Sequence, residues 1–424
     1  MELTDDERAI LDGRRGRTWQ KILATVVAYG DAFGADRLVE ITGAPHFVMS
    51  FGTGFTRPYL AMVESLAAEG LTVPRPFTVD PRPFDFAGTP TGWLSRLAFR
   101  FVYSQQSSYE ARLRQLGLRD PDAFSCACYL PEVGNVPRAG DVLAWSESSA
   151  VVFANSALGA RTNRNSGGID LLCNVAGRTP RFGLLTDEGR RPTRRIEVRT
   201  RALPHPQLLG DAVGRIAQDA VPWIAGLERH LDPGRAAELR DYLKDLGAAA
   251  AASGAVGLFH AEGLTPEARA DPALRPAAGC PTDTIDDDGL ARRSSELAGV
   301  AGRGRRPTRC FIGCPHLSLE QLRRWTERLA VGLSRRRRRK PAVETLLCTA
   351  PAVRSALRAD AASTRRLRES GARVTTLCPL MYLANPLLRS GDVVTSSCKL
   401  RTYTAARFLP DDELLELLLE GGRS

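Results

Sequence analysis

The chain has 424 residues, more than one hydrophobic core usually supports, so the sequence predicts two or three α/β units. Its 43% hydrophobic and 25% charged residues are typical of a globular protein, and the acidic amino terminus and lack of a long apolar run argue against membrane association and favour a cytoplasmic protein. The net charge of +10 lies largely in the arginine-rich runs 302–306 and 335–340, which lack interleaved aromatic residues and so indicate exposed linkers rather than a nucleic-acid-binding module.

The first third of the chain alternates helical and strand-like patterns. Residues 4–28 predict an opening helix, and residues 38–41 predict a strand. A second helix has Thr56 as its N-cap, Pro58 in its first turn and Gly70 as its terminator. An extended segment follows it. This order of strand, helix and strand predicts an α/β protein with mainly parallel sheets flanked by helices.

A third predicted helix, residues 147–158, begins with a polar turn. That turn contains Glu147, Ser148 and Ser149. Free backbone N–H groups and the positive end of the helix dipole suit such a turn to binding a carboxylate or phosphate, although the same residues are also ordinary helix caps. Arg161 and Arg164 follow closely in the chain and favour the interpretation as a binding site.

The middle of the chain, residues 200–270, has mainly helical patterns. His260 and Glu262 are possible active-site residues there, although a single histidine is more often structural. Residues 268–308 mix proline, aspartate, glycine and arginine, and indicate a connector between two halves. The sequence therefore predicts two α/β regions, residues 1–283 and 284–424.

The second half repeats one local arrangement, a short strand followed by a cysteine and a proline. Residues 309–312 predict a strand and residues 313–316, Gly-Cys-Pro-His, the turn leaving it, before a capping box opens a helix. Residues 373–377 predict a strand that precedes Cys378. Cys314 and Cys378 would thus lie beyond the carboxyl ends of parallel strands, where open α/β sheets place their ligands.

Nine cysteines, an odd number, argue against a disulfide framework. Cys126 or Cys128, ahead of a polar turn, is the third candidate for a shared metal site. The spacings are too long for a metal-binding signature, so the polar Gly/Pro-containing turns carry this prediction. The remaining cysteines of apolar segments are predicted to lie in the core, namely Cys173, Cys310 and Cys348.

Several motifs in fixed order resemble the catalytic subunit of aconitase X over essentially the whole chain. They are residues 128–135, Ala-Trp-Ser-Glu-Ser-Ser-Ala at 144–150, residues 154–164, Gly-Leu-Phe-His at 257–260, Gly-Cys-Pro-His-Leu-Ser at 313–318, Cys-Pro at 378–379 and Thr-Ser-Ser-Cys-Lys at 395–399. The resemblance implies a hydro-lyase of the aconitase superfamily, with an aconitase-like multi-domain fold that lacks the small swivelling domain. It also implies a separate small subunit carrying that domain.

The resemblance further implies an iron-sulfur cluster, 4Fe-4S or 2Fe-2S, that three cysteines hold. The implied ligands are Cys128, Cys314 and Cys378, with Cys126 as the alternate to Cys128. Ser397 matches the serine base of the family, and Lys399 would help to activate it. The implied substrate-contacting positions are Glu147, Ser148, Ser149, Arg161, Arg164, Ser50, Asp80 and Cys398. Three departures from the family pattern, Ser396, Cys398 and the pair Thr376-Leu377, affect the choice of substrate more than the reaction class.

This assignment is chemically consistent. A cluster held by three thiolates leaves one iron open as a Lewis acid for a leaving hydroxyl, while arginines and N–H groups can hold a carboxylate. Family members dehydrate cis-3-hydroxy-L-proline or mevalonate 5-phosphate, and residues 126–135 and 185–190 favour the hydroxyproline. The alternatives are an isomerase on the same scaffold and a non-catalytic, basic nucleic-acid-binding protein.

Overall fold

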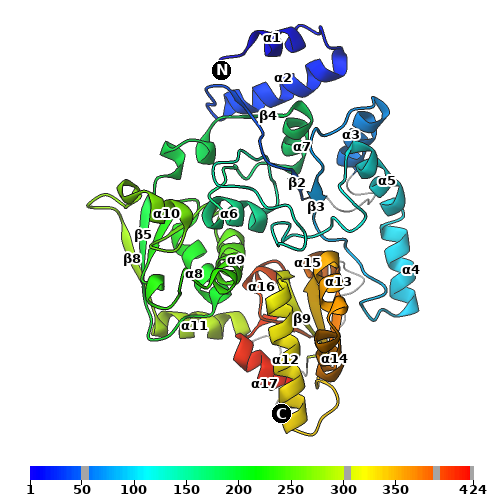
Figure 1. Ribbon diagram of the computed structural model, residues 1–424, viewed down its shortest axis with the longest axis vertical. Helices are drawn as coiled ribbons and strands as arrows, with labels where there is room; N and C mark the ends of the chain where they lie inside the picture. The colour runs from blue at the N-terminus through cyan, green and yellow to red at the C-terminus, as the bar shows by residue number, and fades with distance from the viewer. Residues whose placement is uncertain (49–56, 300–306, 385–391, 421–424) are drawn as a thin grey trace.

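The structure is a computed structural model that describes residues 1–48, 57–299, 307–384 and 392–420 (Figure 1). Two parallel sheets, each flanked by helices, form the middle and the carboxyl-terminal parts of the chain. The amino-terminal part is mainly helical and carries two small two-stranded sheets. This architecture confirms the predicted α/β class. In the described residues, no helix is both long enough and apolar enough to cross a membrane.

The amino-terminal part extends from the first helix to the fourth strand. Its elements are α1 (Asp5–Leu11), α2 (Arg17–Ala32), β1 (Leu38–Glu40), β2 (His46–Phe47), α3 (Arg57–Ala68), β3 (Thr78–Val79), α4 (Trp93–Val102), α5 (Gln106–Leu116), α6 (Ser148–Ala157), α7 (Gly167–Ala176) and β4 (Arg178–Pro180). The predicted helix over residues 4–28 is two helices instead. Gly13 and Gly16 lie between them with φ angles of 83° and 92°, a left-handed conformation that interrupts a helix. The predicted N-cap Thr56 lies outside the described residues.

The middle part contains a four-stranded parallel sheet in the order β7-β6-β5-β8. Its elements are η2 (Gly183–Leu185), η3 (Glu188–Arg190), β5 (Arg194–Arg199), α8 (Pro206–Ala217), β6 (Pro222–Ala225), η4 (Leu227–Arg229), α9 (Ala236–Ser253), β7 (His260–Ala261), α10 (Pro266–Ala270), η5 (Pro272–Leu274), β8 (Thr282–Asp286) and α11 (Asp287–Ala298). The glycines of α8 allow close packing against α9, since a Cβ on Gly210 would lie 2.2 Å from the carbonyl oxygen of Leu246.

The prediction that residues 268–308 form a connector is wrong in part. This segment contains the edge strand β8, which pairs with β5, and the helix α11. The polar composition misled the prediction because an edge strand and a surface helix each bury only one face. The predicted boundary between residues 283 and 284 falls within β8.

The carboxyl-terminal part contains a five-stranded parallel sheet in the order β11-β10-β9-β12-β13. Its elements are β9 (Arg309–Leu317), α12 (Leu319–Arg335), β10 (Glu344–Thr349), α13 (Pro351–Ala359), α14 (Ala361–Ser370), β11 (Arg373–Thr375), α15 (Pro379–Ala384), β12 (Val393–Thr395), α16 (Cys398–Tyr403), β13 (Arg407–Phe408) and α17 (Asp411–Glu420). The predicted capping box is confirmed, because Ser318 and Gln321 exchange hydrogen bonds at the start of α12.

The predicted turn at residues 313–316 is wrong, because these residues belong to β9. Leu347 pairs with Ile312, yet Thr349 pairs with Leu317, so β9 bulges between these two pairs. Gly313 has a φ angle of 108°, and a Cβ there would lie 2.3 Å from the carbonyl oxygen of Cys348. The bulge therefore projects the Cys314 segment from within the central strand rather than from a loop beyond it.

Candidate active site

A buried ion pair marks the centre of the candidate site. Glu147 is the N-cap of α6 and accepts a hydrogen bond from the backbone N–H of Ala150 at 2.6 Å. Its other carboxylate oxygen lies 2.6 Å from Nζ of Lys399, on α16, and both side chains are less than a tenth exposed. Ser149 donates to Glu147 at 2.6 Å and lies 3.2 Å from the same ammonium. The turn that the sequence assigned to an external anion is thus occupied by its own carboxylate.

The two charges of this pair stabilise one another. Burial acts to raise the pKa of Glu147, but the Lys399 ammonium and the hydrogen bonds of Ser149 and Ala150 lower it to about 2. Burial acts to lower the pKa of Lys399, and Glu147 reverses that effect and raises it. Both groups are therefore charged at neutral pH although water is nearly excluded.

A cavity of about 380 Å³ lies against this pair. Its lining residues are Val48, Asp80, Pro81, Ser146, Glu147, Ser148, Arg164, Asn165, Cys378, Leu380, Met381, Lys399 and Tyr403. Six of the site residues named from the sequence are among them, and they come from all along the chain. Burial raises the pKa of Asp80 to about 6, although His46 opposes that rise. The cavity thus holds one carboxyl group that titrates near neutrality.

Three cysteine thiols share one electrostatic neighbour, the ammonium of Lys399. Burial raises the pKa of Cys126, Cys314 and Cys378, and that of Cys378 reaches about 12. The positive charge of Lys399 opposes this rise at each of the three thiols. Cys314 in turn contributes to raising the pKa of Cys126 and of Cys378. These cysteines, separated by more than sixty residues from one to the next, therefore influence one another electrostatically.

His316 joins the three chain segments that carry these cysteines. Its backbone N–H donates to Sγ of Cys126 at 3.4 Å, and its ring lies 3.3 Å from Oγ of Ser125 and 3.2 Å from the carbonyl oxygen of Leu377. Because a carbonyl only accepts, Nε2 carries the proton and Nδ1 accepts from Ser125. Burial lowers the pKa of His316 to about 4, so the ring is neutral. In the sequence, His316 stands out only as part of the motif Gly-Cys-Pro-His-Leu-Ser, and its place two residues after Cys314 was the available signal.

Cys128 lies in a different environment from Cys126. It is fully buried in an apolar cluster with Tyr129 and Phe153, and Cys128 together with Asp80 raises the pKa of His46 to about 10 against the effect of burial. The ring of His46 lies 2.9 Å from Oγ1 of Thr78 and 3.5 Å from Asp80. The structure thus groups Cys126 with Cys314 and places Cys128 beside His46.

Ser397 supports the Cys314 segment directly. Its hydroxyl donates to the carbonyl oxygen of Cys314 at 2.5 Å and accepts from the backbone N–H of Leu400 as the N-cap of α16. Gln207 donates to the same carbonyl oxygen at 3.0 Å. Ser397 is 1% exposed and is not among the residues that line the cavity.

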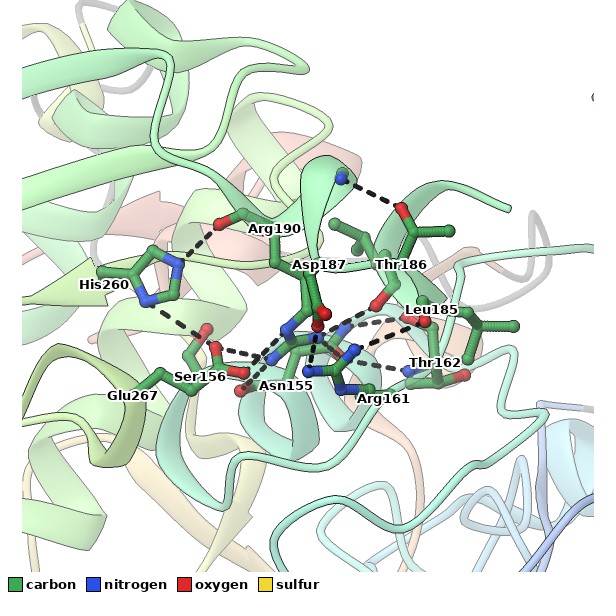
Figure 2. A network of polar contacts seen from close by, with 12 residues as sticks. Asn155, Ser156, Arg161, Thr162, Leu185, Thr186, Asp187, Arg190, His260 and Glu267 are labelled. Carbon is green, nitrogen blue, oxygen red and sulfur yellow. Dashed lines mark hydrogen bonds and ion pairs between the residues drawn. The ribbon is translucent and has the colours of Figure 1, made fainter. Parts of the chain in front are cut away.

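Arg161 lies in a separate polar network (Figure 2). It forms an ion pair with Asp187 at 2.6 Å and approaches the carbonyl oxygen of Leu185. Next to this pair, the buried Arg190 binds Glu267 with two nitrogens, at 2.8 and 2.9 Å, and contacts Asn155. The ring of His260 lies 2.9 Å from the carbonyl oxygen of Arg190. These contacts give Arg161 and His260 structural partners away from the Glu147–Lys399 pair.

The remaining predicted residues lie elsewhere. Cys398 is 1% exposed and packs with Phe408 in the apolar cluster of the middle sheet. Cys173, Cys310 and Cys348 are buried without exposure, which confirms the prediction that they are core residues. Ser50 lies outside the described residues.

The candidate metal donors near the cavity are thiols. Within the residues that the structure describes, no three His, Cys, Asp or Glu side chains are grouped to hold a metal ion. A cluster interposes several iron atoms between its cysteines, so its ligands need not converge on one point, and three free thiols beside a buried cation suit its thiolate ligands. The residues present fit the group.

The fold and the site together place the chain among enzymes with a multi-domain α/β scaffold. Family models for the first, second and third domains of aconitase X match residues 1–188, 192–294 and 309–411. The chain belongs to the aconitase X family, as its sequence motifs predicted. The crystal structure of Thermococcus kodakaraensis aconitase X in its holo-form aligns with a TM-score of 0.81 and 27% identity over 100% of both chains.

Two groups of relatives share this family. The phosphomevalonate dehydratase large subunit of Methanothermobacter thermautotrophicus is 33% identical over 358 residues, 82% of this chain and 80% of the relative. The cis-3-hydroxy-L-proline dehydratase of Pseudomonas aeruginosa is 30% identical over 410 residues, 94% of this chain and 65% of the relative. Both are dehydratases, and this protein is a hydro-lyase. The family relationship suggests an iron-sulfur cluster, and the relatives named large subunits imply a separate small subunit.

Proposed function

We propose that the protein is the large subunit of an iron-sulfur dehydratase for a small hydroxy acid, with Cys126, Cys314 and Cys378 as the cluster ligands. One observation carries this proposal. His316 joins the three distant segments that carry these thiols, and the positive charge of the buried Lys399 opposes the rise of the pKa of each thiol. An apolar core needs neither the ammonium nor the polar ties, whereas thiolate ligands gain from a nearby positive charge.

A cluster in this position would supply a Lewis acid for the leaving hydroxyl of the substrate. The chain's own groups perform the remaining tasks. Lys399 favours the thiolate forms of the cysteines, and Glu147 fixes Lys399 beside them through a 2.6 Å contact. Because this pair is nearly dry, its charges act more strongly than they would in water. The role of Glu147 and Lys399 is therefore to supply fixed charges beside the cysteines rather than to bind the substrate directly.

The cavity supports a zwitterionic substrate such as cis-3-hydroxy-L-proline. Arg164 is exposed, has no carboxylate partner among the described residues, and can bind the substrate carboxylate. Asp80 can accept the ring ammonium, in addition to its contact with the ring of His46 at 3.5 Å. With Glu147 and Lys399 neutralising one another, Arg164 and Asp80 are the other charged side chains of the lining. An amino acid carries one charge of each sign to match them.

Mevalonate 5-phosphate is the second candidate, and its support is the similarity to one of the two groups of relatives. The phosphomevalonate dehydratase large subunits are 32–35% identical and match 76–85% of this chain. A phosphorylated hydroxy acid carries more negative charge than Arg164 alone balances. Further cations would have to come from outside the described lining, and the small subunit is the proposed source.

Cluster binding is tested by cysteine variants purified and reconstituted without oxygen, with iron, sulfide and visible absorption as readouts. We expect Cys126→Ala, Cys314→Ala and Cys378→Ala to remain folded and to lose the cluster. Cys173→Ala, a fully buried cysteine of α7, is the matched control and should keep it. Cys128→Ala decides between the two neighbouring candidates. Retention of iron in Cys126→Ala together with its loss in Cys128→Ala would replace Cys126 by Cys128, and iron binding by all variants would refute the proposal.

Ser397 remains the proposed proton acceptor on the family resemblance. This role requires Ser397 to react as an alkoxide, so the proton that its hydroxyl now donates to the carbonyl oxygen of Cys314 must first pass to solvent, and the neighbouring positive charge of Lys399 would favour that loss. Ser397→Ala should keep iron and lose turnover by a factor of about 100 or more, the usual contribution of a general base. Loss of iron instead would show that the hydroxyl positions Cys314.

The substrate is tested with both compounds in the presence of the small subunit. We expect formation of a dehydrated product from cis-3-hydroxy-L-proline. A product that is an isomer of the substrate and still carries the hydroxyl group would indicate an isomerase. Asp80→Asn should weaken binding of the amino acid by at least about tenfold, because it removes the partner of the ammonium. Turnover of mevalonate 5-phosphate alone, with no effect of Asp80→Asn on its binding, would favour the second candidate.

We further propose that the small subunit docks beside the cavity on helix α4. Four large apolar residues of this helix are exposed, Trp93, Leu94, Leu97 and Phe101. The opposite side of α4 holds Phe99, whose ring stacks on Tyr382 of α15, and α15 lines the cavity with Leu380 and Met381. The apolar face is therefore one helix away from the candidate active site.

Docking is tested by mixing the two subunits and measuring their complex by analytical ultracentrifugation. The variant Trp93→Ser/Phe101→Ser should weaken the complex by at least about tenfold while the large subunit stays folded and keeps its iron. Phe33→Ser, an exposed aromatic residue at the C-cap of α2, is the control and should have no effect. Equal affinity for both variants would place the small subunit elsewhere.

A further inference from the structure

A second, strongly basic hollow lies in the carboxyl-terminal part of the molecule. It has a volume of about 730 Å³ and lies where the carboxyl-terminal ends of α12 and α14 meet, two helices that pack side by side (Figure 1). The charged residues of its lining are Arg335, Arg338, Arg339, Arg366, Arg368 and Glu369. We call it the arginine hollow. Its volume is within the usual range for small-molecule sites.

Among the described residues, most arginines of this hollow have no carboxylate partner. Arg366 has two, Glu327 at 2.6 Å and Glu369 at 2.9 Å. Arg338 donates to the carbonyl oxygen of Leu419, which carries no net charge. The side chains of Arg335, Arg339 and Arg368 have no hydrogen bond or ion pair within the described part of the chain. Four guanidinium groups therefore face one hollow with no neutralising carboxylate from the residues that the structure describes.

The arginines of the same basic run differ in whether they have a carboxylate partner. Arg336 forms ion pairs with Glu416 at 2.5 Å and with Glu420 at 3.7 Å on α17, and it does not line the hollow. Cations near helix carboxyl ends interact favourably with the helix dipole, which explains single arginines at the ends of α12 and α14. It does not explain four unneutralised ones around a concavity, because like charges repel one another there.

We propose that the arginine hollow binds a compact ligand with consecutive phosphate groups, either inorganic triphosphate or the triphosphate tail of a nucleotide. Guanidinium forks bind phosphate oxygens with two parallel hydrogen bonds, and several forks on a concave wall match successive phosphates. No aromatic side chain is among the lining residues, so the hollow offers no platform for base stacking. The phosphates therefore carry the recognition. This site is independent of the proposed dehydratase function.

Binding is measured by isothermal titration calorimetry with inorganic triphosphate and the full chain at low ionic strength. We expect saturable binding of one triphosphate per chain. Arg339→Gln should weaken it by at least about tenfold, the usual effect of losing one charge-assisted hydrogen bond. Arg337→Gln is the matched control, because Arg337 is exposed, belongs to the same run, carries the same charge and does not line the hollow. It should change the affinity less than about twofold.

Three further ligands identify what is recognised. Equal affinities for ATP and inorganic triphosphate, with no binding of adenosine, would support recognition of the phosphates alone, and tighter binding of ATP would support a nucleotide as the source. Absence of saturable triphosphate binding would overturn the proposal. So would equal losses in Arg337→Gln and Arg339→Gln, or tighter binding of a single-stranded oligonucleotide, because each indicates a diffuse basic surface. Dehydratase activity should be the same in both variants.

Discussion

The substitution His316→Ala examines how the three cysteine segments are held together. It removes the ring that contacts Oγ of Ser125 at 3.3 Å and the carbonyl oxygen of Leu377 at 3.2 Å. Both groups are buried, and leaving a buried polar group without a partner costs about 1–3 kcal/mol each. The missing ring also leaves a cavity. We therefore expect the free energy of unfolding to fall by about 3–5 kcal/mol.

The more specific expectation concerns iron. Without the ring, the segments before Cys126 and Cys378 lose their common anchor, so the variant should bind the cluster weakly even at temperatures where it remains folded. Urea unfolding measures the stability, and iron content after anaerobic reconstitution measures the cluster. His316→Gln should restore part of the iron, because its amide can still donate to the carbonyl of Leu377.

His260→Ala separates positioning from general stability. His260 is also buried and also contacts a backbone carbonyl, that of Arg190 at 2.9 Å, but it lies in the network of Figure 2. It should lose comparable stability and keep its iron. If His316→Ala binds as much iron as His260→Ala at matched stability, the reasoning about the shared anchor is refuted.

Two further predictions concern charges. Lys399→Met leaves the carboxylate of Glu147 buried and unpaired, so the free energy of unfolding measured in urea should fall by about 3–5 kcal/mol. The double variant Glu147→Gln/Lys399→Met should recover part of that loss, because it removes the unpaired charge. A double variant as unstable as the single one would contradict the pairing. Asp85 accepts hydrogen bonds from the backbone of Gly88 and Thr376, and these lower its pKa although burial acts to raise it. Its contribution to the free energy of unfolding is therefore fully present above the ordinary pKa of 3.8. It is lost as the pH falls through the lowered pKa. Asp85→Asn should therefore cost about 2 kcal/mol at neutral pH and flatten the loss of stability in acid, and an unchanged acid profile would contradict this assignment.

Local signals in the sequence predicted much of the fold. The capping box of Ser318 and Gln321 and the helix that begins after Glu147 depend on neighbours within four residues, so they are confirmed closely. The strand β8 and the bulge at Gly313 were missed, because both depend on a neighbouring strand that lies far away in sequence. Edge strands and bulges have weak sequence patterns for this reason.

The candidate site was likewise predictable from the sequence only in part. Motifs identified Glu147, Lys399 and the cysteine segments, but they could not tell that the carboxylate and the ammonium bind each other rather than a substrate. Nor could they separate Cys126 from Cys128. Thiols two residues apart on an irregular segment can lie in different environments, and the surroundings of Cys128 are set by the packing of Tyr129 and His46.

By itself, then, the sequence determined the family, the reaction class and the types of side chain available for chemistry, because motifs and helix signals are encoded by residues close together in the chain. The tertiary structure decided which of those side chains meet. His316 joins three segments separated by some 60 to 190 residues, and a lysine from α16 neutralises a carboxylate from α6. Such partners are chosen by packing and by the cost of burying an unpaired charge, and these act only once the chain is folded.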